Sequence, residues 1–222
     1  MKSQSGFTLV EIAIVLVIIG LLLGGVLKGQ ELINSAKVKN FAQDFKSVPL
    51  FIYGYQDKFK ALPGDDSKYT TNLGGAATAA GVTLLVPGNG TLGNGVIEGL
   101  YNSTTGTHET VAFWQQVRLA GLAAGPTAFT TPSSDLPTNA DGGRIGIQQS
   151  ASPITGMTGS YFVCSDGIQG KFAKQLDTTL DDGDTATGSV RVMAAGYTGT
   201  AQAATATTAI VDGTTYTVCM SL

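Results

Sequence analysis

Two apolar patterns follow one another at the N-terminal end of the chain. Phe7–Leu27 is an apolar run in which Glu11 is the only ionisable residue. As a helix, this run would be about 31 Å long, close to the hydrocarbon thickness of a bilayer, roughly 30 Å. We therefore expect it to cross a membrane. The leader Met1–Gly6 carries Lys2 and no acid, which favours a cytoplasmic N-terminus.

A secretory signal peptide explains this run less well. Such signals have an apolar core of roughly 7–15 residues, followed by a cleavage site with small residues. The run is longer, and Lys28–Phe45 continues in helical style without an obvious cleavage loop. A plain single-pass membrane anchor is the simplest alternative.

Beyond the run, apolar residues recur at alternating steps of three and four positions. This stripe predicts that the helix continues and packs one face on a globular domain. Its members are Val38, Phe41, Phe45, Val48, Ile52, Tyr55 and Phe59. A coiled coil is an alternative, but only about three heptads are present. Pro49 lacks a backbone donor, so we expect a bend or a break there, and the turn residues Ala61–Asp66 should end the helix.

The distal region, from residue 67 onwards, is rich in Gly, Thr, Ala, Asn and Ser. We expect loops over Thr70–Thr107 and Gly125–Gly159, a helix over Glu109–Leu122, and a second helix over Ile168–Leu176 that ends near Asp177. Short segments rich in β-branched or aromatic residues predict strands; these are Arg144–Gln148, Gly159–Cys164, Ser189–Ala195 and Thr214–Met220. The expected fold is α+β, with an antiparallel sheet packed on the long N-terminal helix.

Charge and cysteine content narrow the function further. Charged residues make up 13% of the chain, the formal net charge is −3, and no basic block appears, so no nucleic-acid partner is evident.

Cys164 and Cys219 each end a predicted strand. An even cysteine count in an exported protein favours one disulfide, with two reduced thiols as the alternative. The bridge would close a loop of about 55 residues and contribute about 4 kcal/mol by the chain-entropy estimate.

An acidic stretch is the main candidate for chemistry. Four carboxylates crowd around Gly183: Asp177, Asp181, Asp182 and Asp184. Calcium takes six to eight oxygen ligands, often from such a loop. The stretch lacks the EF-hand pattern, and Asp-Asp-Gly-Asp also makes a good exposed turn. The loop Gly88–Glu98 is similar but contains one carboxylate.

Catalytic motifs are missing from the sequence. There is no G-x-S-x-G elbow, Walker loop or H-E-x-x-H motif. The single histidine, His108, is expected near the start of the Glu109 helix, and Trp114 in the core. We therefore expect a non-enzymatic protein without catalytic residues and without a cofactor, calcium at the acidic stretch aside.

The residues Gly6-Phe7-Thr8-Leu9-Val10-Glu11 before the apolar helix resemble the processing signature of type IV prepilins and type II secretion pseudopilins. A short basic leader ends in Gly, Phe follows, and Glu stands at the fifth position counted from that Phe. The resemblance implies that prepilin peptidase, a membrane-embedded aspartyl protease, cuts between Gly6 and Phe7 and that Phe7 is N-methylated. The layout of the long helix is similar to that of the pilin fold.

This resemblance also assigns a role to Glu11. A charge at the centre of a membrane helix costs roughly 2.5–3.5 kcal/mol, so Glu11 needs a partner. After cleavage the Phe7 amine is positive, and methylation keeps that charge. The resemblance implies that Glu11 of one subunit approaches the Phe7 amine of its neighbour, which favours one register in a filament. Alternatively, Glu11 reaches the lipid headgroups.

Two further stretches, Leu62–Asp65 (LPGD) and Phe113–Leu122 (FWQQVRLAGL), resemble a bacterial subgroup of pseudopilin-like proteins. In many pilins a disulfide similarly ties down the C-terminal region. We therefore expect four parts: a leader (1–6), a membrane and filament-core helix (7–27), its continuation on the domain (28–60), and a globular domain (61–222).

The expected function is a structural subunit of a type IV pilus or a type II secretion pseudopilus. Its expected partners are other pilin-like subunits in a homo- or hetero-oligomeric filament, prepilin peptidase, an inner-membrane assembly platform and the membrane itself. The globular domain would be periplasmic or part of an extracellular filament. The alternative is a membrane-anchored binding protein or adhesin, including a minor pilin that binds a surface ligand.

Overall fold

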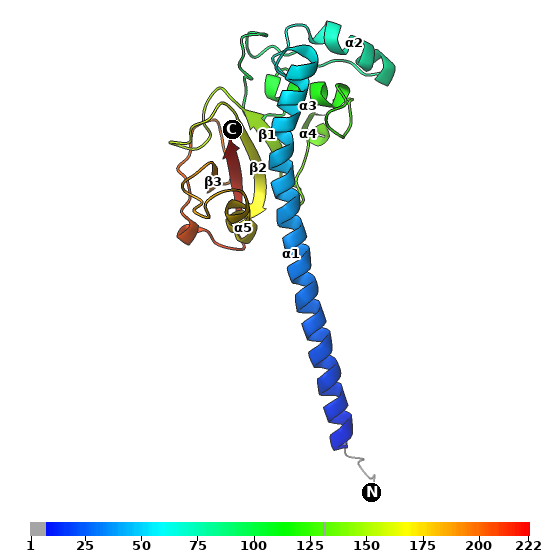
Figure 1. Cartoon of the computed structure of the whole chain (residues 1–222), viewed down its shortest axis with the longest axis vertical. Coiled ribbons are helices and arrows are strands. Elements are labelled where there is room, and N and C mark those ends of the chain that lie inside the picture. The colour runs from blue at the N-terminus through cyan, green and yellow to red at the C-terminus, as the bar shows by residue number, and fades with distance from the viewer. Residues whose placement is uncertain (1–7, 131) are drawn as a thin grey trace.

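The computed structural model describes residues 8–130 and 132–222. Its dominant element is α1, Leu9–Phe59, a single helix of 51 residues. At 1.5 Å per residue it is roughly 75 Å long. The rest of the chain gathers around its C-terminal half, while the N-terminal half projects away from the domain (Figure 1). The predicted α+β fold, a long N-terminal helix on an antiparallel sheet, is confirmed.

The C-terminal half of α1 packs on the domain through one stripe of side chains. The buried residues of the helix are Val38, Phe41, Ala42, Phe45, Val48, Ile52 and Tyr55. Phe59, the last member of the predicted stripe, is partly buried against the same core. The stripe is therefore covered by the chain's own domain rather than by a second coiled-coil helix, and we call residues 38–59 the packed half of α1.

The predicted break at Pro49 is wrong, because α1 runs through this residue without interruption. A proline inside a helix costs about 3 kcal/mol relative to alanine. Val48 and Ile52, on either side of Pro49, are each 1% exposed in one shared core. Burying such side chains contributes about 1.5–3 kcal/mol each, which is enough to offset the cost of the proline and keep the helix continuous.

The described residues form a four-stranded antiparallel sheet in the order β1-β2-β4-β3. Its strands are β1 (Ile145–Gln148), β2 (Phe162–Gln169), β3 (Val190–Ala194) and β4 (Thr215–Ser221). Cys164 in β2 lies directly opposite Cys219 in β4, and the two form a disulfide. The predicted cysteine pairing is confirmed, and the bridge joins the two central strands.

Helix α5, Gly170–Leu180, packs on both α1 and the sheet, and Figure 1 shows it near the lower end of the sheet. The ring of Phe172 packs on that of Phe41 in α1, with 6.1 Å between the centroids. The sequence-based boundaries, Ile168–Leu176, were too early at both ends. Ile168 belongs to β2, where it pairs with Tyr216 of β4. The helix continues one turn past Leu176, and its residues Leu176 and Asp177 are buried.

The remaining helices lie at the distal end, near the C-terminus of α1. They are α2 (Tyr69–Ala80), α3 (Glu109–Leu119) and the short α4 (Pro132–Asp135), and a 3₁₀ turn, η1 (Thr207–Ala209), lies beyond β3. The predicted loop over Thr70–Thr107 is therefore wrong where α2 forms. Leu73 and Ala77, four positions apart, are buried on its inner face, and this tertiary contact outweighs the two glycines inside the helix.

Candidate functional site

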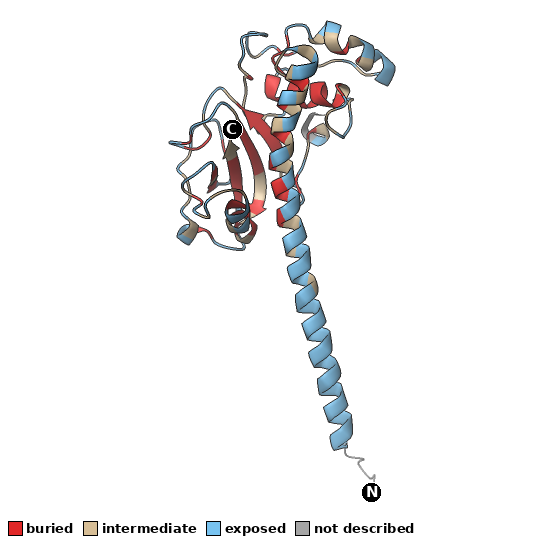
Figure 2. Ribbon diagram, in the orientation of Figure 1, coloured by how far each residue is buried: buried red, intermediate tan, exposed pale blue. Residues whose placement is uncertain are grey.

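The N-terminal part of α1 presents apolar side chains to solvent on every face. All residues from Thr8 to Lys28 are exposed, in contrast to the packed half (Figure 2). Leu9, Leu21 and Leu27, for example, are 88%, 73% and 66% exposed. We call residues 9–28 the exposed half of α1. Within the part of the chain that the structure describes, α1 is the one helix long and apolar enough to cross a membrane.

Glu11 closes the N-terminal end of this exposed half. Its carboxylate Oε2 accepts hydrogen bonds from the backbone N–H and the hydroxyl of Thr8, both at 2.8 Å. In return, the Glu11 backbone N–H donates to Thr8 Oγ1 at 3.3 Å. The pair forms a capping box, which satisfies donors that the first turn of a helix leaves open. Glu11 therefore has a local partner within its own chain.

The leader and the first residue of the proposed mature chain, Gly6 and Phe7, lie outside the described residues. Cleavage after Gly6, methylation of Phe7 and the contact between Glu11 and a neighbouring Phe7 amine therefore stay predictions.

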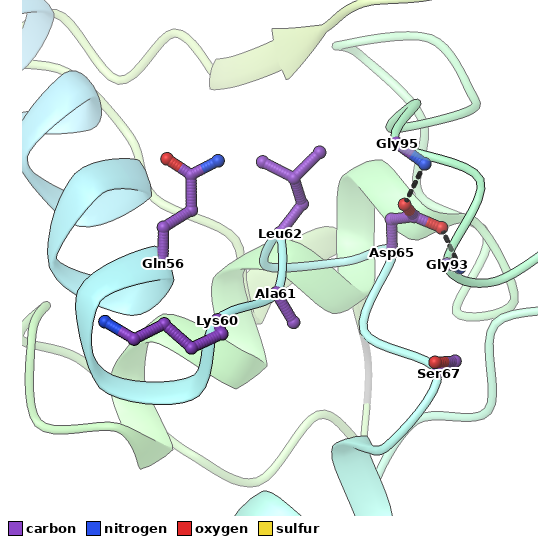
Figure 3. A pocket seen from close by; sticks show the side chains of 8 residues that line it. All are labelled: Gln56, Lys60, Ala61, Leu62, Asp65, Ser67, Gly93 and Gly95. Carbon is purple, nitrogen blue, oxygen red and sulfur yellow. Dashed lines mark hydrogen bonds between the residues drawn. The ribbon is translucent and has the colours of Figure 1, made fainter.

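At the other end of α1, the LPGDD turn organises the distal loops. Lys60 ends the helix in the left-handed conformation, with φ 55°. The carboxylate of Asp65 then accepts hydrogen bonds from the backbone N–H groups of Gly93 and Gly95, at 2.5 and 2.7 Å, and a longer one from Asn94. Figure 3 shows both short contacts and the Asp65 side chain directed toward this loop. Asp65 thus fastens the glycine-rich loop to the end of α1.

Asp66 performs a similar task for α1 and α2. Its carboxylate accepts hydrogen bonds from the Tyr55 hydroxyl at 2.8 Å, the Lys68 backbone N–H at 2.7 Å and the Asn72 amide at 2.7 Å. Tyr55 is fully buried, and burial together with the Asp66 contact raises the pKa of its hydroxyl. The two adjacent aspartates therefore bind different segments: Asp65 holds the glycine-rich loop, and Asp66 holds α1 and the start of α2.

The FWQQVRLAGL stretch, Phe113–Leu122, contacts the LPGD stretch, Leu62–Asp65. The side chain of Gln116 in α3 accepts a hydrogen bond from the Gly64 backbone N–H at 2.6 Å. Gly64 has φ +91°, and a Cβ on it would collide with the Glu109 carbonyl. The neighbouring Gln115 binds the loops before and after α3, through Leu85 and the carbonyl of Thr127. The LPGD and FWQQ segments therefore form one junction at the distal end.

Two carboxyl groups meet within this junction. Glu109, the first residue of α3, is 0% exposed, and its Oε2 accepts a hydrogen bond from the Glu98 backbone N–H at 2.8 Å. Burial and the nearby Glu98 carboxyl group raise the pKa of Glu109 well above its ordinary range. His108 precedes it as the N-cap residue of α3, and its Nδ1 lies 2.8 Å from the Ser103 hydroxyl.

A surface cavity of about 510 Å³ lies beside the LPGDD turn (Figure 3). Gln56, Lys60 and Leu62 line one side of it, and the glycine-rich loop lines the other. Lys60 donates to the backbone and carboxylate of Asp57, and Asp65 is occupied by the loop N–H groups. The cavity could accommodate a small ligand, but its charged groups already have partners.

The predicted calcium residues lie at the end of α5 and in the turn after it. Asp181 accepts a hydrogen bond from the Val190 N–H, and Asp182 from the Asp184 N–H and the Thr187 hydroxyl. Asp177 is fully buried, and burial raises its pKa to about 6. Over residues 8–130 and 132–222, no three His, Cys, Asp or Glu side chains are grouped to hold a metal ion. Calcium binding at Asp177, Asp181, Asp182 and Asp184 stays a prediction without a grouped ligand set.

Sequence reasoning missed three residues of these sites. Thr8 carries the capping box, and the spacing T-x-x-E before an apolar run was the available signal. The partners of Asp65 and Gln116 are 28 to 52 positions away in sequence, and no local pattern could have named them.

Comparison with known proteins identifies the N-terminal segment. Residues 1–27 match the prokaryotic N-terminal methylation motif, which is the type IV prepilin-like signature. The resemblance inferred from Gly6–Glu11 is therefore confirmed. The motif supports a protein of the type IV pilin or pseudopilin type that prepilin peptidase processes, and with the apolar half of α1 it indicates membrane anchoring. No curated protein and no solved structure matches the chain.

Proposed function

We propose that this chain is a structural subunit of a type IV pilus or type II secretion pseudopilus filament, assembled through the exposed half of α1. The observation that carries the proposal is the exposed, all-round apolar helix half that lies within the match to the methylation motif. A helix that is apolar on every face is stable only inside a membrane or a bundle of similar helices. A pilin-type subunit passes from the first environment to the second.

In this proposal Glu11 exchanges one partner for another. Before processing, its carboxylate caps its own helix through Thr8. Cleavage after Gly6 creates a positive Phe7 amine, and a neighbouring subunit's amine then offers Glu11 an opposite charge in an apolar surrounding. An unpaired charge is costly there, so pairing would favour one axial stagger between subunits.

The proposed location follows from the same helix. The N-terminus would face the cytoplasm, the exposed half of α1 would cross the inner membrane, and the globular domain would be periplasmic or extracellular. Prepilin peptidase and the inner-membrane assembly platform would be the partners during assembly. The role is mechanical, and we propose no catalytic activity.

The test separates the charge of Glu11 from its capping role. Gln also completes a capping box, so Glu11→Gln should leave the start of the helix intact. We expect normal cleavage, but filaments in the sheared fraction reduced at least about tenfold, because each subunit contact loses a charge pair. Glu31→Gln is the matched control, because Glu31 is exposed on the same helix and pairs with Lys28. Unchanged filaments in the Glu11→Gln strain would contradict the proposal.

A second candidate is an anchored binding protein, favoured by the distal cavity of about 510 Å³. In that case the helix only tethers the domain. Mass spectrometry of the mature N-terminus separates the two functions: methylated Phe7 supports the filament subunit, and an intact Met1 supports the tether.

A further inference from the structure

Asp44, on the packed half of α1, carries a partly buried carboxylate without a partner in its own chain. Among residues 8–130 and 132–222, none donates a hydrogen bond to this carboxylate or forms an ion pair with it. Burial alone raises its pKa to about 6. A charge that is partly withdrawn from water and left unpaired destabilises the isolated subunit. A cation from outside the chain would therefore bind favourably at Asp44.

A small surface cavity lies beside this carboxylate, with a volume of about 170 Å³. Phe51 of α1 and Trp114 of α3 help to line it, and their rings meet edge to face with 6.4 Å between the centroids. Sites for small molecules are usually larger, roughly 300–1,000 Å³. A cavity of this size suits one side chain, and a carboxylate beside aromatic rings favours a cationic one.

The chain's own Arg118 lines the same cavity but does not neutralise Asp44. Arg118 is 7% exposed, and its Nη1 donates to the backbone carbonyls of Pro126 and Asp135 at 2.9 and 2.6 Å. Its guanidinium also lies over the ring of Phe129, 5.3 Å from the centroid. These contacts hold the guanidinium on the segment after α3, so the Asp44 carboxylate is still available to a second cation.

The packed half also carries cations that have no acid partner. Lys39 and Lys46 are exposed, and neither side chain forms an ion pair or a hydrogen bond with any of the described residues. By contrast, Lys37 binds Asp141 at 2.6 Å. A second copy of the chain therefore offers the charge that Asp44 lacks.

The proposed contact between Glu11 and a neighbouring Phe7 amine selects between the two lysines. Glu11 is four positions after Phe7, so the contact shifts parallel neighbours by four residues, roughly 6 Å. Because α1 is one uninterrupted helix, the same shift places Asp44 level with position 40 of the neighbour, next to Lys39 and six residues from Lys46. At about 100° per residue, Glu11 and Asp44 lie roughly 60° apart around α1, so both can face the same neighbour.

Building on the proposed filament function, we propose that the cavity at Asp44 binds the Lys39 ammonium of a second copy of this chain. The ammonium pairs with the carboxylate and lies against the aromatic rings of the cavity. Once the neighbouring subunit covers this cavity, the two charges attract each other more strongly than in water. The pair lies roughly 50 Å along α1 from Glu11, so the two contacts together fix the stagger of neighbouring subunits at both ends of the helix.

The yield of sheared filaments from charge-removing variants tests the contact. Asp44→Asn and Lys39→Gln should each be cleaved normally and lower the yield at least about tenfold, because each leaves one charge of the pair covered without its partner. The double variant should lose no more than either single variant, because both substitutions remove the same contact. Lys46→Gln is the matched control, since it removes an exposed lysine from the same helix, and it should assemble like the wild type.

The stability of the subunit separates an assembly defect from a folding defect. The purified Asp44→Asn chain should be at least as stable as the wild type at pH 7.5, because it no longer buries an unpaired charge. Thermal unfolding in detergent measures this. A variant that is stable but does not assemble has lost a contact between subunits.

A carbodiimide, which joins a carboxylate directly to an amine in contact with it, tests the pairing in wild-type filaments. We expect a covalent dimer in which mass spectrometry finds a peptide containing Asp44 linked to one containing Lys39. Within one helix these residues are five positions apart and face different sides, so a dimer with this link reports a contact between subunits. A link from Asp44 to Lys46, or no link at Asp44, would overturn the assignment.

The variants also separate this contact from the filament function on which it rests. If Glu11→Gln lowers the filament yield while Asp44→Asn and Lys39→Gln assemble like the wild type, the contact at Asp44 is wrong and the filament function stands. If the wild-type chain enters no filament, both proposals fail.

Discussion

The two halves of α1 are both rich in apolar side chains, but only one half is covered by the chain's own domain. In the packed half, the buried positions follow one stripe (Figure 2), and the other faces are mostly polar, with Leu50 and Tyr53 as exposed exceptions. In the exposed half, apolar residues occupy all faces and nothing in the described chain covers them. A helix with one apolar stripe is covered by packing that single face on a partner, whereas a helix that is apolar on every face is stable only in an apolar environment. One continuous helix therefore packs on its own domain at one end and presents an uncovered apolar surface at the other.

The largest expected effect comes from truncating one aromatic residue in the packed half. Phe41 is 0% exposed, so Phe41→Ala should lower the free energy of unfolding by about 3–5 kcal/mol. Leu16→Ala, in the exposed half, should change it by no more than about 0.5 kcal/mol, because Leu16 is 64% exposed. Denaturant unfolding of the two purified variants measures both values. Equal losses would mean that the two halves do not differ as described.

The next effect concerns the sheet behind the packed half. The double variant Cys164→Ala/Cys219→Ala removes the bridge between β2 and β4, which spans 55 positions. The chain-entropy estimate predicts a loss of about 4 kcal/mol in unfolding free energy. Dithiothreitol should destabilise the wild type in denaturant unfolding and leave the double variant unchanged. A variant as stable as the oxidised wild type would refute this contribution.

The smallest effect is a pH dependence on the packed half. Asp44 is partly buried, and burial raises its pKa to about 6. Because the folded pKa lies above the unfolded value of about 3.9, the protonated folded form is favoured, and this stability is lost as pH rises through 6. Asp44→Asn should therefore be more stable than the wild type at pH 7.5, with an advantage that disappears toward pH 4.

Thermal unfolding across this pH range measures the effect of Asp44→Asn. Asp57→Asn is the control, because the Asp57 side chain is 91% exposed on the same helix. A constant difference between Asp44→Asn and the wild type from pH 4 to 7.5 would contradict the assignment. Glu11, on the exposed half, differs from Asp44 because its carboxylate accepts two hydrogen bonds from Thr8.

Local patterns predicted much of the fold. The stripe from Val38 to Tyr55 identified the packed face of α1, and short segments rich in β-branched or aromatic residues located all the described strands, although β2 extends five residues past its predicted end at Cys164. Boundaries and weak helices were less predictable. Pro49 and the glycines of α2 oppose helix formation locally, and only the burial of Ile52 or Leu73 against distant residues outweighs them.

The sequence by itself determined the methylation motif, the all-round apolar segment and the stripe, because each is a periodic or short-range pattern that the chain shows without folding. Only the tertiary structure decided what Asp65, Gln116 and Glu109 do. Their partners come from loops 11 to 52 positions away, and spacing cannot identify such contacts. The physical reason is that buried polar groups must find partners wherever the packed topology places a donor or an acceptor.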